Sequence, residues 1–212
     1  MKNKYSLSVR EITEMAIFTA IAIVLDTFVK IPLGATGGSL NFSLIPILIL
    51  AFRQGPVKGF IAGGFIYGLV TSLIDGYGMN MYLFDYLIPF GACATIGIAS
   101  PYVFRNFEKG KDEKVISFVF VASMVLLQGI IRLIFSSIDS VLFYGLTYVE
   151  GLAYNIIYIF PTTILNMVLL CLLVPVLIKI SRRYKTQFIK EIKYTDLFAE
   201  KKDKEETGKV EE

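Results

Sequence analysis

Long apolar blocks separated by short polar or charged connectors dominate the hydrophobic pattern of this chain. A helix needs roughly 20 mainly apolar residues to cross the hydrocarbon core of a bilayer, and most of the blocks approach that length. The pattern therefore predicts an all-α integral membrane protein with six transmembrane helices. The six predicted helices cover about residues 11–31, 40–52, 59–74, 81–104, 115–138 and 150–180.

The charged residues gather in the connectors and at the two ends of the chain. Of the 21 lysines and arginines, only Lys30 and Arg132 fall outside residues 1–10, the connectors 53–58 and 105–114, and the C-terminal end of the chain from residue 179 onward. Cytoplasmic loops of membrane proteins carry an excess of Lys and Arg, so both termini are expected to be cytoplasmic. The predicted parts are a cytoplasmic N-terminus at 1–10, a membrane substrate-binding domain at 11–181 and a charged, partly disordered cytoplasmic tail at 182–212.

Composition excludes several classes of protein. With 55% hydrophobic and only 18% charged residues, the chain is not a soluble domain, and its basic residues do not form the face that a nucleic-acid partner would need. Absence of histidine removes Ser-His-Asp catalysis and HExxH zinc sites, so a membrane-embedded enzyme is disfavoured. Cys93 and Cys171 lack CxxC spacing, and no cofactor or metal is expected. No GxxxxGK[ST] motif occurs, so ATP-driven transport would need an ATPase on another polypeptide.

Asp85 stands out because it lies among aromatic residues just inside the fourth apolar block. An ionised side chain within a bilayer costs on the order of 2.5–3.5 kcal/mol or more unless it has a partner. Three explanations fit the sequence: a bound polar or cationic ligand, an internal partner such as Arg132, or a position shallow enough to stay wet. Intramembrane ionisable groups are usually functional, which favours the ligand.

Further acidic and aromatic residues gather at the predicted outer ends of the helices. Aromatic belts at membrane interfaces would explain the tyrosines, but they do not explain the carboxylates. Carboxylates among aromatic rings suit an organic cation, which is attracted to both. The sequence therefore predicts an outer ligand pocket. The outer group comprises Asp26, Asp75, Asp85, Asp139 and Glu150 with Tyr67, Tyr82, Tyr86, Ser136, Ser140, Tyr144, Tyr148, Tyr154 and Asn155.

Several blocks of the sequence, in this order, resemble the thiamine-binding S components of energy-coupling-factor (ECF) vitamin transporters. The matching blocks are GSLNFSLIPIL at 38–48, AFRQGPVKG at 51–59, Asp85-Tyr86, Arg132 with FYG at 143–145, and YNIIYIFP at 154–161. The resemblance covers about residues 9–183. It implies a six-helix subunit of the bacterial cell membrane that captures a vitamin outside. The uncharged, glycine-rich loop at 32–39 is suited to serve as a lid over that site. The resemblance also implies partners: an ECF transmembrane coupling subunit and two ABC-type ATPases.

The resemblance also implies roles for individual residues. Ala16 and Ala20 fall where such subunits dock on the coupling subunit, and Asp85 falls where the family has an acid that contacts the aminopyrimidine. Asn155 matches an asparagine of the family site. Tyr86 and Tyr67 lie at or beside aromatic positions, Tyr67 in place of a tryptophan.

Three departures from the family pattern lie in the expected pocket: Tyr144 replaces a tryptophan, Ser136 a histidine and Glu150 a tyrosine. These residues, with Ser140 and Tyr82, complete the expected substrate contacts. The added carboxylate favours thiamine, a pyrimidine precursor or an analogue. Two alternatives stay open: an S component for a different vitamin, and a stand-alone secondary transporter of a small organic cation in which Asp85 and Arg132 form an ion-coupling pair.

Overall fold

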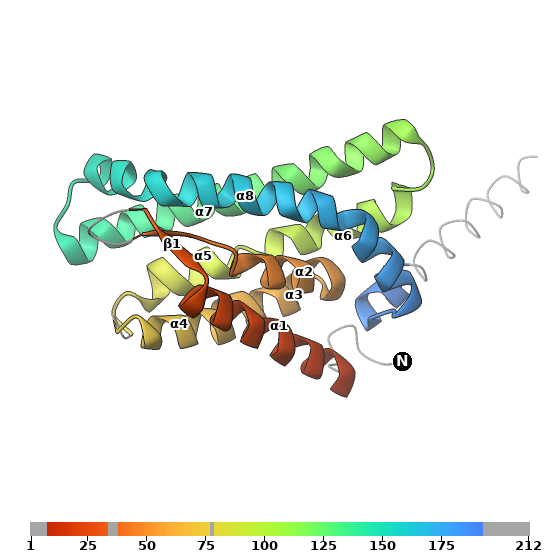
Figure 1. Cartoon of the computed structure of the whole chain (residues 1–212), viewed down its shortest axis with the longest axis horizontal. Coiled ribbons are helices and arrows are strands. Elements are labelled where there is room, and N and C mark those ends of the chain that lie inside the picture. Colours follow the sequence, from red (N-terminus) through yellow and green to blue (C-terminus); the bar gives the residue numbers. More distant parts are fainter. Residues whose placement is uncertain (1–7, 34–37, 77–78, 193–212) are drawn as a thin grey trace, which may run out of the picture.

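The computed structural model describes residues 8–33, 38–76 and 79–192, and its helices run along one long axis (Figure 1). Its elements are α1 (Val9–Phe28), β1 (Lys30–Pro32), β2 (Ser39–Asn41), α2 (Leu44–Gln54), α3 (Pro56–Phe60), the π-helix η1 (Ile61–Tyr67), α4 (Gly68–Ile74), the π-helix η2 (Tyr82–Leu87), α5 (Ile88–Gly91), α6 (Ala94–Asn106), α7 (Lys111–Tyr144) and α8 (Tyr148–Arg183). The two strands form an antiparallel hairpin in which Ile31 pairs with Leu40.

Four helical stretches within the described residues are long and apolar enough to cross a membrane. They are Pro56–Ile74, Tyr82–Asn106, Lys111–Tyr144 and Tyr148–Arg183. The helix α2 is apolar but shorter, and α1 has 20 residues but carries Glu11, Glu14 and Asp26. The all-α membrane class thus agrees with the structure, whereas the count of six spans and the orientation of the termini stay predictions.

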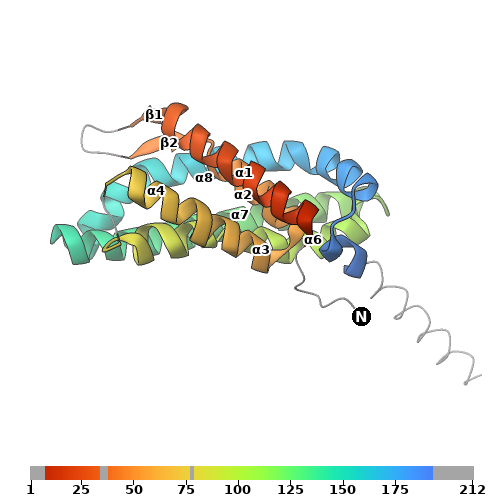
Figure 2. The ribbon, with the colours of Figure 1, turned by 90° about the horizontal axis from the view of Figure 1, so that it is seen from below.

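The short helix α2 lies inside the bundle. Nine of its eleven residues are buried, and the side chains of Leu44, Ile47, Leu48 and Phe52 have almost no exposed surface. Figure 2 shows α1 on the outside of the bundle with α2 behind it. A short helix enclosed in this way is stabilised by packing against its neighbours.

The glycines of the third apolar block permit a close approach between helices. A Cβ atom added to Gly63 would collide with the carbonyl oxygen of Phe90, and one added to Gly64 would lie 2.8 Å from the carbonyl oxygen of Leu87. Both contacts are with backbone atoms, which cannot move aside cheaply. The glycine spacing therefore allows Pro56–Ile74 to pack directly against the backbone of 87–90, as small residues do in membrane helix pairs.

The predicted outer connector at 139–149 is wrong over most of its length. Helix α7 continues to Tyr144, so Asp139 and Ser140 are helical. Residues 139–144 include no helix breaker, and the helix ends where Gly145 adopts a left-handed conformation with φ +65°. Helix α8 begins at Tyr148, directly after its N-cap Thr147, so the connector consists only of residues 145–147.

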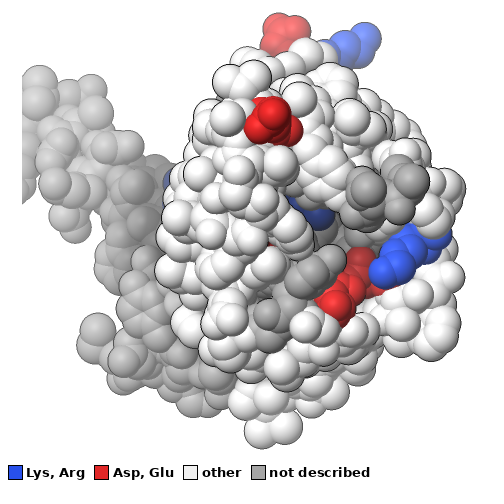
Figure 3. All heavy atoms as spheres, turned by 90° about the vertical axis from the view of Figure 1, so that its left-hand side faces the viewer, with Lys and Arg blue, Asp and Glu red and all other residues white. Residues whose placement is uncertain are grey.

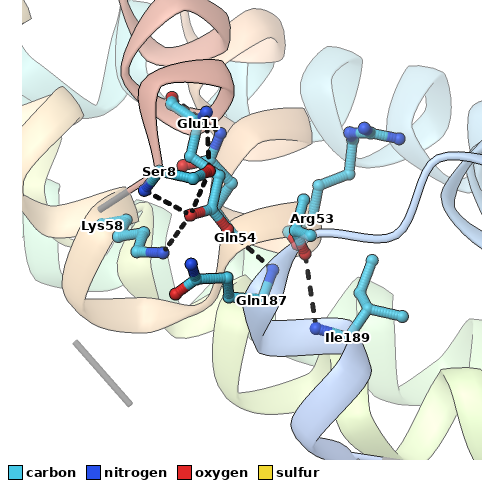
Figure 4. Close-up of polar contacts among 8 residues, drawn as sticks. Ser8, Glu11, Arg53, Gln54, Lys58, Gln187 and Ile189 are labelled. Carbon is cyan, nitrogen blue, oxygen red and sulfur yellow. Dashed lines mark hydrogen bonds and ion pairs between the residues drawn. The ribbon is translucent and has the colours of Figure 1, made fainter. Parts of the chain in front are cut away.

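A network of charged and polar groups joins α1, α2 and α3 at the end of the bundle that holds Glu11 (Figure 4). The carboxylate of Glu11, 2% exposed, lies 3.1 Å from the ammonium of Lys58 and accepts hydrogen bonds from Ser8. Arg53 pairs with Glu14 at 2.5 Å and donates to Ser181 at 3.1 Å. Buried charges at this end of the bundle are thus held in opposite pairs. We call this group the basal network.

The first part of the charged tail belongs to the same network. The hydroxyl of Thr186 donates to the carbonyl of Arg53 at 2.6 Å, and the backbone N–H of Gln187 donates to Glu11 at 2.8 Å. Residues 187–192 are helical, and Ile189 and Ile192 are buried. The tail is therefore packed on the bundle up to residue 192, and the predicted disordered part beyond it lies outside the described residues.

The basal network yields a prediction about stability. Glu11→Gln leaves the buried ammonium of Lys58 without a counter-charge and should destabilise the protein by about 3 kcal/mol, as measured by thermal unfolding in detergent. Glu108→Gln is the matched control, because the pair between Glu108 and Arg182 is about half exposed and should contribute less than about 1 kcal/mol. Equal losses in the two variants would contradict this account.

Candidate functional site

A cavity of about 710 Å³ opens at the end of the bundle opposite the basal network, where Figure 3 shows a hollow with acidic and basic side chains around it. Its walls come from the end of α1, the β1–β2 hairpin, η2, α5, α7 and α8. Its lining residues are Asp26, Lys30, Gly38, Ser39, Asn41, Asp75, Asp85, Tyr86, Phe90, Arg132, Ser136, Asp139, Ser140, Tyr144, Leu146, Tyr154, Asn155 and Tyr158.

The lining combines excess negative charge with aromatic rings. Four carboxylates face two cationic side chains, Lys30 and Arg132, which leaves a formal charge of −2 when all are ionised. Five of the lining residues are tyrosine or phenylalanine. This is the combination that attracts an organic cation, through charge and through the electron-rich ring faces. A pocket of acids and aromatics is thus present at the end of the bundle where the sequence predicts one, and its outward orientation stays a prediction.

Asp85 reaches the cavity from the π-helix η2. Ser136 on α7 donates a hydrogen bond of 2.5 Å to its carboxylate, which links η2 to α7 across the cavity wall. Next to it, the hydroxyl of Tyr86 donates to the carboxylate of Asp75 at 3.0 Å. A π-helical turn inserts an extra residue into the helix and often occurs at functional sites. Here it belongs to the segment that carries two successive cavity residues.

Asn155 fixes the wall between α7 and α8. Its side-chain nitrogen donates to the hydroxyl of Ser140 at 3.0 Å and to the carbonyl of Gly151 at 2.8 Å. Its side-chain oxygen accepts a hydrogen bond from the hydroxyl of Tyr158. The amide is 2% exposed and bonded on both its nitrogen and its oxygen. These bonds orient the polar edge that α8 presents to the cavity.

A second chain of hydrogen bonds runs from the cavity into the core. Asn41 donates to the carboxylate of Asp26 at 2.9 Å, and Ser43 donates to the side-chain oxygen of Asn41 at 3.0 Å. Tyr67 then donates to Ser43 at 2.7 Å. The ring of Tyr67 packs against Phe90, with the ring centroids 4.8 Å apart. Tyr67 therefore supports the cavity wall from behind and does not line it.

Arg132 lies over an aromatic ring. Its guanidinium carbon is 5.2 Å from the centroid of the Phe90 ring, a favourable cation–π distance. The sequence suggested Arg132 as an internal partner of Asp85, but within the described residues Arg132 forms an ion pair with neither Asp85 nor Asp139. Its charge is thus held within the cavity without being neutralised by direct contact with a carboxylate.

Six of the nine expected substrate contacts line the cavity: Asp85, Tyr86, Ser136, Ser140, Tyr144 and Asn155. Tyr67, Tyr82 and Glu150 do not. The hydroxyl of Tyr82 donates to the backbone carbonyl of Gly64 at 3.0 Å, which directs this side chain toward the neighbouring helix. The expected contacts thus gather at one end of the bundle, but some of them line the cavity and others support its wall.

Glu150 caps helix α8 instead of facing the cavity. Its carboxylate accepts hydrogen bonds from the N–H of Thr147 at 2.8 Å and from its hydroxyl at 2.7 Å. Thr147 in return accepts a bond from the N–H of Glu150. The residues TYVE at 147–150 follow the capping-box pattern, so the sequence carried a signal for this role. The sequence predicted that Glu150 would add a carboxylate to the pocket, but Glu150 caps the helix and does not line the cavity.

Several lining residues were not among the nine expected substrate contacts. Asp139 was placed in the outer group but not among those contacts, and it lies three residues after Ser136 on the same face of α7. Tyr158 lies three residues after Asn155 on α8. Helical spacing from a predicted contact would have identified both as contacts. Lys30 and Asn41 come from the paired strands β1 and β2. They were not predicted as site residues, because no pattern in the sequence indicates that hairpin.

The expected lid and docking residues lie in two different places. The β1–β2 hairpin borders the cavity through Gly38 and Ser39, and residues 34–37 of the predicted lid lie outside the described residues. Ala16 and Ala20 are exposed on α1, on the same side as Ile17 and Ile21. Their place on the surface is compatible with docking, which stays a prediction.

In comparisons with known proteins, the sequence family, the curated relatives and the solved structure that match this chain are all thiamine transporters. The sequence profile of the thiamine transporter protein family matches residues 12–182. The thiamine transporter ThiT of Bacillus subtilis is 31% identical over 175 residues, 76% of this chain and 88% of that protein. ThiT of Lacticaseibacillus paracasei is 29% identical over 142 residues, 63% of this chain and 68% of that protein. A solved structure of ThiT from Listeria monocytogenes shares the fold, with a TM-score of 0.67 at 21% identity over 80% of this chain and 97% of that one.

The hydrogen-bond chain behind the cavity gives a second prediction. Asn41→Ala removes the donor to Asp26 and the acceptor for Ser43 in one step, and should destabilise the protein by about 1–3 kcal/mol in thermal unfolding because polar groups are left unpaired. Asn106→Ala is the control, since Asn106 donates one local bond to the carbonyl of Tyr102. A loss of stability that is no greater than in the control would contradict the role assigned to Asn41.

Proposed function

This chain belongs to the thiamine transporter protein family, and we propose that it is the substrate-capture (S) subunit of an ATP-driven ECF-type importer. Its ligand is thiamine or a closely related vitamin or precursor, bound in the cavity described above. The observation that carries this proposal is the cavity itself, in which carboxylates outnumber cations among aromatic rings. The family consists of transporters, which sets aside the enzyme alternative.

The cavity suits the chemistry of such a ligand. Its volume of about 710 Å³ is in the range of small-molecule pockets, roughly 300–1,000 Å³. Asp85 can accept a hydrogen bond from an exocyclic amino group, and the rings of Tyr144, Tyr154 and Tyr158 can face a cationic heterocycle. Tyr86, Asn155, Ser136 and Ser140 supply further polar contacts. Since Tyr67, Tyr82 and Glu150 do not line the cavity, we assign them supporting roles.

The proposed membrane arrangement has six spans, with both termini in the cytoplasm of a bacterium. The distribution of Lys and Arg supports this orientation, because it places the basal network and the basic connectors inside and the cavity outside. The two remaining helices, α1 and α2, complete the six. Residues 11–181 are then the substrate-binding domain, between the cytoplasmic N-terminus at 1–10 and the cytoplasmic tail at 182–212.

Energy for uptake comes from partner subunits in this proposal, because the sequence has no GxxxxGK[ST] motif for binding ATP. The partners are an ECF transmembrane coupling subunit and two ABC-type ATPases. The exposed alanines Ala16 and Ala20 allow another helix to approach α1 closely, as small residues do in membrane interfaces. The subunit would bind its ligand from outside, and the partners would drive its reorientation.

A secondary transporter of a small organic cation is the second candidate. It is favoured by Arg132 and Asp85, which line one cavity without a direct ion pair between them and could serve as an ion-coupling pair. Uptake assays with the purified chain alone in proteoliposomes under an ion gradient separate the two functions. Net accumulation of thiamine would support the secondary transporter, and binding without accumulation supports the capture subunit.

The first prediction of this proposal concerns Asp85. Asp85→Asn should weaken thiamine binding by roughly ten- to a hundredfold, because a charge-assisted hydrogen bond to the ligand contributes about 1.5–3 kcal/mol. Isothermal titration of the detergent-purified chain measures this affinity. Asp112→Asn, the same chemical change at an exposed position of α7, should bind like the parent. Unchanged affinity in Asp85→Asn would remove Asp85 from the site.

The second prediction concerns docking. Ala16→Leu with Ala20→Leu should leave thiamine affinity unchanged and abolish ATP-driven uptake, because two larger side chains prevent close approach of a partner helix. Uptake of radiolabelled thiamine by cells that express the partner subunits measures the effect. Ala153→Leu, at an exposed position of α8, is the control and should transport normally. Transport at the parent rate in the double variant would refute the docking face.

A further inference from the structure

The four carboxylates of the cavity differ in one respect. Three of them accept a hydrogen bond from a protein side chain, and the fourth, Asp139, has no hydrogen-bond partner within the described residues. The three satisfied pairs, donor first, are Asn41–Asp26 at 2.9 Å, Tyr86–Asp75 at 3.0 Å and Ser136–Asp85 at 2.5 Å. The fold therefore supplies a donor for every cavity carboxylate except one.

Asp139 is also almost completely enclosed. The residue is 2% exposed, and its Oδ1 atom is buried without a partner. It lines the cavity from the same face of α7 as Arg132 and Ser136, seven and three residues earlier. Arg132, the nearest candidate for a counter-ion on that face, forms no ion pair with it in the described part of the chain. In the described part of the chain, the cavity wall thus contains a buried acceptor that no protein donor satisfies.

A buried carboxylate without a donor is unfavourable, and it lowers stability unless something else supplies the donor. The cavity is the one place from which that donor can come, since Asp139 is part of its wall. We propose that Asp139 is a second ligand-contacting carboxylate, which accepts a hydrogen bond from an N–H group of the bound substrate beside the one that Asp85 accepts. This inference rests on the proposed function, because it names the group that the same site recognises.

The positions of the two acids define the chemistry of that group. Ser136 holds Asp85 against α7 one turn before Asp139, and both carboxylates line the same cavity. Two carboxylates in one cavity repel each other, so a group placed between them carries two N–H donors or a positive charge. An exocyclic amino group on a heteroaromatic ring has two N–H donors, one for each acid. The site therefore selects amino-substituted heteroaromatic cations over analogues that lack the amino group.

Titration of two ligands against Asp139→Asn tests this assignment. The ligands are thiamine and an analogue in which hydrogen replaces the pyrimidine amino group, each measured by calorimetry with the full-length chain. We expect the substitution to weaken thiamine binding about tenfold or more and to change binding of the analogue less than about threefold. Asp112→Asn on the same helix should change neither. Equal effects on the two ligands, or no effect on thiamine, would overturn the assignment.

Thermal unfolding of the ligand-free protein provides an independent measurement. If the carboxylate of Asp139 has no partner in the ligand-free protein, Asp139→Asn removes an uncompensated charge. The melting temperature should then be equal to or higher than that of the parent. A fall relative to Asp112→Asn would show that Asp139 has a structural partner, and would refute the inference. If the parent chain does not bind thiamine, the proposed function fails, and the melting temperature alone then supports or refutes the unpaired state of Asp139.

Discussion

Charged groups inside an apolar bundle must be compensated, and the two ends of this protein meet that requirement differently. Moving a charge out of water is costly in a low-dielectric interior, so a buried ion is stable only with a partner. In the basal network the partners are protein groups: Lys58 with Glu11, and Arg53 with Glu14 and Ser181. In the cavity the balance is incomplete, because carboxylates outnumber cations. The first arrangement closes one end of the molecule, and the second prepares the other end to receive a cation.

The all-α membrane class was predictable from the sequence, because the length of the apolar blocks follows directly from the thickness of the bilayer, whereas the six spans and the orientation stay predictions. The family was predictable as well, from the ordered blocks around Asp85 and Asn155, and the profile match confirms it. The helix boundaries near the cavity were not predictable from the sequence. Residues 139–149 were expected in a connector rich in Tyr and Ser, yet Asp139, Ser140 and Tyr144 are helical and line the cavity. The polar residues that suggested a loop belong to the site.

The same reason explains which site residues could be found. Asp85 and Ser136 face each other from different helices, and the ordered resemblance identified both. Tyr67 and Glu150 have the right chemistry at the right end of the bundle, but hydrogen bonds to Ser43 and Thr147 engage them elsewhere. Residue type and depth in the membrane indicate which groups gather at a site. Only the direction of each side chain separates the groups that touch a ligand from those that hold the wall.

Helix α1 connects the functional parts of the molecule. Near its C-terminal end Asp26 is bonded to Asn41 on the cavity wall, and near its N-terminal end Glu11 is paired with Lys58 in the basal network. Between these anchors, Ala16 and Ala20 are exposed. A helix fixed near both ends cannot easily shift against the rest of the bundle. A partner bound at its exposed middle would therefore move the whole bundle, cavity included, which suits a subunit that changes orientation as one body.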